Sequence, residues 1–105
     1  MNLKTKHITD LIKNAIKQVD ANTEIILYGS RARGDEREDS DWDILILTNY
    51  AVDLNIERKF RNKLYDIELI TGESLSVFVY SKNNWVTKQK ITSFFKNVTQ
   101  EGIML

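Results

Sequence analysis

Apolar residues near the start of the chain recur at spacings of three and four positions, which predicts an amphipathic helix over Lys4–Val19. The apolar positions of this helix are Ile8, Leu11, Ile12, Ala15, Ile16 and Val19. The polar segment Asp20–Asn22 ends the pattern. The β-branched run Glu24–Tyr28, which stops at Gly29, predicts a short strand. We therefore expect the chain to begin with a helix followed by a strand.

A buried strand and a long helix are predicted for the middle of the chain. The apolar run Trp42–Leu47 is interrupted only by Asp43, a pattern typical of a strand buried on both faces. Asp53 can cap a helix that continues to about Thr71, with Gly72 as its stop. One face of that helix carries Ile56, Phe60, Leu64 and Ile67. The polar stretch before the buried strand, residues 29–38, is expected to be a loop or a short helical turn.

The last third of the chain predicts a third strand followed by one or two closing helices. In the segment Leu75–Tyr80, alternate side chains point to opposite faces of a sheet. The closing helices end near Gly102, and their apolar residues are Trp85, Ile91, Phe94, Phe95 and Val98. The order helix-strand-strand-helix-strand-helix predicts an α+β (or α/β) fold, with a small mixed β-sheet packed against helices.

Composition narrows the class of protein. The 105 residues are expected to form a single domain, residues 1–105, and 42% hydrophobic with 29% charged residues is an ordinary globular balance. The chain has no cysteine, which excludes disulfides and thiolate metal sites. It shows neither a long apolar run nor the apolar stretch of a signal peptide, so we expect no membrane contact and a cytoplasmic location.

The charge balance bears on the partner. Fifteen basic and fifteen acidic residues leave a net charge of zero. Proteins that grip long nucleic acids usually carry a basic excess, because much of their affinity comes from neutralising phosphates. Strong nucleic-acid binding is therefore not expected, and a small anionic ligand or another protein is the favoured partner.

Two aspartates mark the first candidate site. Asp41 and Asp43 are two positions apart at the start of a predicted strand, so their carboxylates share a face while Trp42 points to the opposite layer. Two close negative charges repel each other, and burial makes them costlier. A hard, oxygen-seeking cation such as Mg²⁺ removes that cost, because it is commonly held by one or two carboxylates together with substrate phosphates.

A glycine–serine pair supplies the complementary half of the site. Gly29 and Ser30 directly follow a predicted strand, where glycine lets the backbone approach a ligand and the serine hydroxyl can donate to a phosphate oxygen. Arg31, Arg33 and Arg37 lie close enough in sequence to add positive charge. Either motif alone is more often an ordinary turn, but together they indicate metal-assisted phosphoryl or nucleotidyl transfer.

One lookalike is excluded. Gly29 and Gly34 have the glycine spacing of a P-loop, but Asp35 and Glu36 stand where that motif requires lysine followed by serine or threonine.

The segments Gly29-Ser30-Arg31-Ala32-Arg33-Gly34 and Ser40-Asp41-Trp42-Asp43-Ile44 together resemble the signature of DNA polymerase β-like nucleotidyltransferases, in particular the minimal, MNT-type domains of bacteria and archaea. The two segments cover only a small part of the chain, but the predicted order of helices and strands agrees with that family along most of its length.

The resemblance implies a role for each residue of the motif. Gly29 and Ser30 would bind the triphosphate of ATP, and Asp41 and Asp43 would coordinate two Mg²⁺ ions and act in catalysis. Arg33 would either contact phosphate or brace the loop against an acidic neighbour, and the sequence leaves both open.

The resemblance also implies a partner. Minimal domains of this family commonly pair with a small helical HEPN-type protein as toxin and antitoxin, and transfer AMP to a tyrosine hydroxyl of that partner. Two alternatives stay open. The chain could be a catalytically degenerate binding module that neutralises a partner by occlusion, or a transferase that acts on a small molecule or RNA.

This sequence departs from the family pattern at one position. Family members usually carry a third carboxylate on a later strand, whereas the polar position of the segment Leu75–Tyr80 is Ser76. A serine hydroxyl replaces a carboxylate neither as a metal ligand nor as a base at neutral pH. Glu68 and Glu73 are the nearest candidates in sequence for that role.

Overall fold

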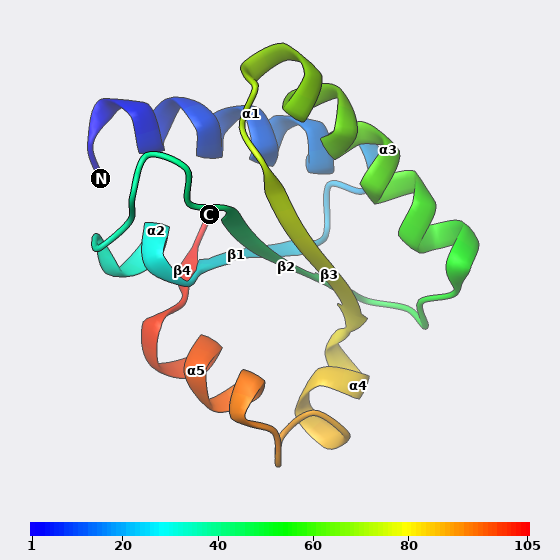
Figure 1. Ribbon diagram of the computed structural model, residues 1–105. Coiled ribbons are helices and arrows are strands. Elements are labelled where there is room, and N and C mark those ends of the chain that lie inside the picture. The colour runs from blue at the N-terminus through cyan, green and yellow to red at the C-terminus, as the bar shows by residue number, and fades with distance from the viewer.

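The computed structural model describes residues 1–105 and contains a mixed four-stranded sheet with helices on both faces (Figure 1). Its elements are α1 (Leu3–Val19), β1 (Glu24–Tyr28), α2 (Ser30–Arg33), β2 (Trp42–Thr48), α3 (Leu54–Thr71), β3 (Leu75–Ser81), α4 (Lys82–Thr87), α5 (Ser93–Glu101) and β4 (Ile103–Met104). The strand order is β3-β2-β1-β4, in which β2 and β3 are parallel and the other pairs are antiparallel. This confirms the predicted α+β fold.

The helix boundaries follow the local capping chemistry. Asn2 accepts a hydrogen bond from the Thr5 backbone N–H at 2.8 Å and starts α1. Asp53 accepts from the Ile56 N–H at 2.9 Å and starts α3. Gly72 ends α3 in the left-handed conformation, with φ 73°. Side-chain oxygens at helix starts and glycine at helix ends satisfy backbone groups that the helix itself leaves unpaired.

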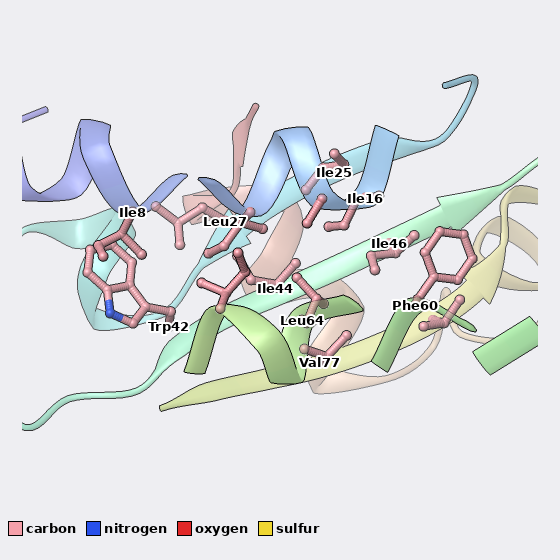
Figure 2. Packing of buried hydrophobic residues seen from close by; sticks show 14 residues of the cluster. Ile8, Ile16, Ile25, Leu27, Trp42, Ile44, Ile46, Phe60, Leu64 and Val77 are labelled. Carbon is pink, nitrogen blue, oxygen red and sulfur yellow. The ribbon is translucent and has the colours of Figure 1, made fainter. Parts of the chain in front are cut away.

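One face of the sheet is covered by α1 and α3 and holds the larger part of the core (Figure 1). Figure 2 shows the apolar side chains of the two helices meeting those of the strands that they cover. The core strand residues on this face include Ile25, Leu27, Trp42, Ile44 and Ile46, all at most 1% exposed. Because side chains alternate along a strand, Asp43 must point to the other face.

The opposite face is covered by α4 and α5 and is largely aromatic. The Phe94 ring lies 5.3 Å from that of Tyr28 and 5.3 Å from that of Trp85, with both pairs edge to face. Phe78, which lies on this face, is 43% exposed, and Ile91 is 87% exposed, so neither residue belongs to the core. The aromatic layer ends at Tyr28, the residue opposite Asp43 on β1.

Two short elements add to the predicted order. Residues 30–33 form the helix α2, which resolves the open choice between a loop and a helical turn. The two-residue strand β4 pairs with β1 after α5. Four-residue helices and two-residue strands are too short for hydrophobic periodicity to predict.

No helix combines the length and the apolar character needed to cross a membrane.

Candidate active site

The predicted site residues meet where β1 ends and β2 begins. Tyr28 pairs with Asp43 in the antiparallel register, so Gly29, the next residue, lies against the Asp43 side chain. A Cβ placed on Gly29 would overlap the Asp43 carboxylate oxygen Oδ2. Gly29 also has φ 75° and ψ −160°, a combination that is essentially restricted to glycine. The glycine is therefore required both by the backbone and by its carboxylate neighbour.

The two aspartates differ in their surroundings. Asp43 lies within β2 and is half-buried beside Gly29, whereas Asp41 is exposed just before β2. Burial raises the pKa of the Asp43 carboxyl, and the negative charges of Asp41 and Glu101 raise this pKa further. The positive charge of Arg33 opposes these effects but leaves the pKa raised, and a further cation beside Asp43 would lower it.

The donor set suits a magnesium ion in part. Carboxylate oxygens are the hard ligands that Mg²⁺ prefers, and a cation would stabilise the ionised form of Asp43, which burial and neighbouring negative charge disfavour. No group of three or more acidic, histidine or cysteine side chains in the chain is arranged to hold a metal. A magnesium ion at Asp41 and Asp43 therefore needs phosphate oxygens or water to complete its coordination.

Gly29 and Ser30, which we call the glycine–serine loop, form a tight turn at the start of α2. The N–H groups of Ala32 and Arg33 both donate to the Gly29 carbonyl at 3.0 Å. Ser30 is the first residue of α2, and its carbonyl accepts from the N–H of Gly34 at 2.9 Å. These hydrogen bonds define the turn that places Gly29 beside Asp43.

Arg31 has a structural role. It does not lie where it would add positive charge near a phosphate, as the sequence suggested. Its side chain is buried, lies 4.4 Å from the centre of the Trp42 ring, and donates to the carbonyls of Glu38 and Ser40 at 3.0–3.3 Å. Its nearest carboxylate is that of Glu73, at 3.8 Å. Arg31 therefore ties the loop before β2 to the core on the face away from Asp43.

We expect Arg31→Ala to lower the free energy of unfolding by about 2–4 kcal/mol, because it removes a buried side chain packed on Trp42 and the hydrogen-bond donor to the Glu38 and Ser40 carbonyls. Arg37→Ala is the control: Arg37 is exposed, and we expect a change within about 0.5 kcal/mol. Urea unfolding followed by tryptophan fluorescence measures both. Equal effects of the two substitutions would contradict the structural role of Arg31.

Arg33 lies at the site and is braced by acidic neighbours. Its guanidinium donates to Asp35 at 3.1 Å and to Glu101 at 2.9 Å, and these two carboxylates raise the Arg33 pKa. Of the two roles that the sequence left open for Arg33, the structure contains the contacts with acidic neighbours that brace the loop. Arg33 also stays next to Gly29 and Ser30.

Glu101 is the site residue that the sequence did not reveal. Its carboxylate accepts a hydrogen bond from the Gly29 N–H at 3.0 Å, in addition to the contact with Arg33. It lies 72 residues from Gly29 in sequence, at the end of α5, and no local motif marks it. The packing of α5 against β1 and the pairing of β4 with β1 bring it there, and neither contact can be predicted from the local sequence.

The position expected for the third carboxylate is occupied by serine. Ser76 pairs with Asp43 across the parallel strands β2 and β3. Glu73 contacts Lys4 at 2.8 Å and accepts from the Trp42 indole N–H at 3.1 Å, on the opposite face of the sheet. Glu68 accepts from the Leu75 backbone N–H at 3.0 Å. Neither glutamate therefore complements Asp41 and Asp43 in this structure.

The chain matches a known family over most of its length. Residues 10–104 match the profile of the family described as Polymerase beta, Nucleotidyltransferase. A protein of Methanocaldococcus jannaschii described as a protein adenylyltransferase is 36% identical over 85 residues, which cover 77% of this chain and 75% of that protein.

Solved structures share the fold at low sequence identity. A nucleotidyltransferase crystal structure from Sulfolobus solfataricus covers 95% of this chain and 80% of its own, with a TM-score of 0.53 and 18% identity. A toxin–antitoxin structure with AMP-PNP matches 88% of this chain and 70% of its own, at TM-score 0.55 and 18% identity. The toxin–antitoxin structure MntA–HpeT matches 99% of this chain and 72% of its own, with a TM-score of 0.58 and 16% identity.

Proposed function

The chain belongs to the polymerase β family of nucleotidyltransferases, and from this premise we propose that it transfers AMP from ATP, with Mg²⁺, to a hydroxyl group of a partner protein. The observation that carries the proposal is the contact between the glycine–serine loop and the carboxylate pair. Gly29 lies directly against Asp43, so a phosphate held by the loop is adjacent to a cation held by the aspartates.

Each residue then has a role that follows from its chemistry. The Gly29 N–H and the Ser30 hydroxyl donate to phosphate oxygens of the nucleotide, and Arg33 adds positive charge beside them. Asp41 and Asp43 hold Mg²⁺, which supplies a Lewis acid for the reacting phosphate and for the pyrophosphate that leaves. The protein contributes mainly orientation and electrostatic stabilisation, as in other phosphoryl transfers.

A protein acceptor is supported by three similar proteins and by the charge of the chain. The Methanocaldococcus jannaschii relative is described as a protein adenylyltransferase, and two structures with the same fold are toxin–antitoxin complexes. The net charge of zero gives the chain no basic surplus for holding long nucleic acids. A small helical protein of the HEPN type, with a tyrosine hydroxyl as the attacking group, is the acceptor we propose.

The test is the intact mass of a candidate HEPN-type partner, co-expressed with this chain and purified. We expect the partner to gain the mass of one AMP, and the adduct to be absent when Asp41 and Asp43 are both replaced by asparagine. An unmodified partner, accompanied by consumption of ATP, would indicate a small-molecule or RNA acceptor instead.

Ser76 favours a second candidate function, that of a binding module which neutralises its partner by occlusion. Since Ser76 pairs with Asp43 on β2, Ser76→Asp would add a carboxylate beside the pair. An adduct that forms only with Ser76→Asp would mean that the natural chain acts by occlusion. Equal adduct formation by both proteins would show that the third carboxylate is not needed.

A further inference from the structure

Glu101 occupies the anion-binding groups of the loop. One of its carboxylate oxygens accepts from the Gly29 N–H at 3.0 Å, and the other accepts from Arg33 at 2.9 Å. These are two of the positive groups assigned above to the nucleotide phosphates. A carboxylate and a phosphate are both oxyanions that accept charge-assisted hydrogen bonds from such donors.

The backbone holds Glu101 in this position. The antiparallel register of β4 pairs Leu27 with Ile103 and Ile26 with Met104. Glu101 is the last residue of α5, two positions before Ile103, so the pairing of β4 with β1 keeps the end of α5 close to Gly29. At Gly102 a side chain would strike the Val98 carbonyl and the Ile26 side chain, so glycine permits the close turn from α5 into β4 (Figure 1).

The electrostatics of this arrangement are unfavourable for the carboxylates. Glu101 and Asp41 both act on Asp43 as like charges, and Arg33 is the cation that opposes them there. A third negative charge beside a carboxylate pair makes the site more negative, and both oxygens of Glu101 already accept from N–H donors. These contacts distinguish Glu101 from a third metal ligand.

Resting on the proposed nucleotide site, we propose that Glu101 is a resident anion of that site: it binds the Gly29 N–H and Arg33 in the free protein and must be displaced by the triphosphate. The Glu101 side chain is 20% exposed and has three rotatable bonds, so it can swing into solvent while β4 stays paired. Glu101 thereby lowers nucleotide affinity, because part of the binding free energy is used to displace it.

The test compares Glu101→Gln with the wild type in calorimetric titrations of inorganic tripolyphosphate in EDTA and of ATP with Mg²⁺. We expect Glu101→Gln to bind both about tenfold more tightly, because the competing charge is gone. Asp35→Asn is the matched control: it removes the other carboxylate on Arg33 and the same unit of charge, but Asp35 makes no hydrogen bond with Gly29. We expect Asp35→Asn to change affinity less than about twofold.

Several outcomes overturn the proposal. Unchanged or weaker tripolyphosphate binding by Glu101→Gln would do so, as would an equal gain in Asp35→Asn. Weaker binding of Mg²⁺-ATP alone would instead make Glu101 a metal ligand. Circular dichroism checks the fold of each variant, and Glu101→Ala repeats the test should the glutamine variant unfold. The metal-free probe separates this inference from the proposed function: tighter tripolyphosphate binding without any ATP binding would support the role of Glu101 and contradict nucleotidyl transfer.

Discussion

Replacing Gly29 by alanine is expected to lower the free energy of unfolding by about 2–4 kcal/mol and to abolish nucleotide binding. The backbone at Gly29 adopts φ 75° and ψ −160°, where a Cβ costs about 1–3 kcal/mol. The added methyl group would also overlap the Asp43 carboxylate, so either the loop or the aspartate must move. Chemical denaturation and ATP titration measure the two effects.

Gly34→Ala provides the matched control at the other end of α2. Gly34 also has a positive φ, 83°, but a Cβ there would meet no atom within 4 Å. Only the conformational cost of about 1–2 kcal/mol is expected, with nucleotide affinity largely retained. Equal losses of affinity in the two variants would show that loop conformation, and not the contact with Asp43, determines binding.

Asp43→Asn is expected to keep the fold at least as stable as the wild type at pH 7 while reducing nucleotidyl transfer by roughly a hundredfold or more. The pKa of Asp43 is raised in the folded protein, chiefly by burial, so its ionised form opposes folding. This penalty is complete above the folded pKa and disappears as the pH falls through the ordinary value of 3.8. Asparagine has no such penalty.

Urea unfolding across pH measures the stability part of this prediction. The variant should gain most relative to the wild type at neutral pH, and the difference should narrow as the pH is lowered toward 3.8. A variant that is clearly less stable than the wild type at pH 7 would mean that Asp43 supports the fold and is not held there at a cost.

The main elements of the fold were predictable because their signals are local. The spacing of Ile8, Ile12 and Ile16 in α1, the cap at Asp53 and the stop at Gly72 each depend on neighbouring residues in sequence. The apolar run in β2 was sufficient to predict this strand. The pairing of strands and the short β4 depend on contacts between distant segments, which periodicity does not report.

The residues of the candidate site also divide into those that a local motif predicts and those that depend on contacts between distant segments. Gly29, Asp41 and Asp43 form a spaced motif within one connection of the chain, and the antiparallel turn from β1 to β2 brings its halves together. Arg31 belongs to the same stretch of sequence, but its long side chain lies on the opposite face of the sheet from Asp43 and packs on Trp42. Glu101 lies 72 residues from Gly29 in sequence, so the motif of Gly29, Asp41 and Asp43 could not reveal it.

The measurement that tests the central claim most directly is calorimetric titration of ATP into the purified protein, with Mg²⁺ and with EDTA, beside the Asp41→Asn, Asp43→Asn double variant. The account predicts binding that requires Mg²⁺ and is lost in the variant, with the fold of the variant intact by circular dichroism. No binding at millimolar ATP, or equal binding by the variant, would contradict a nucleotide site built on this loop and carboxylate pair.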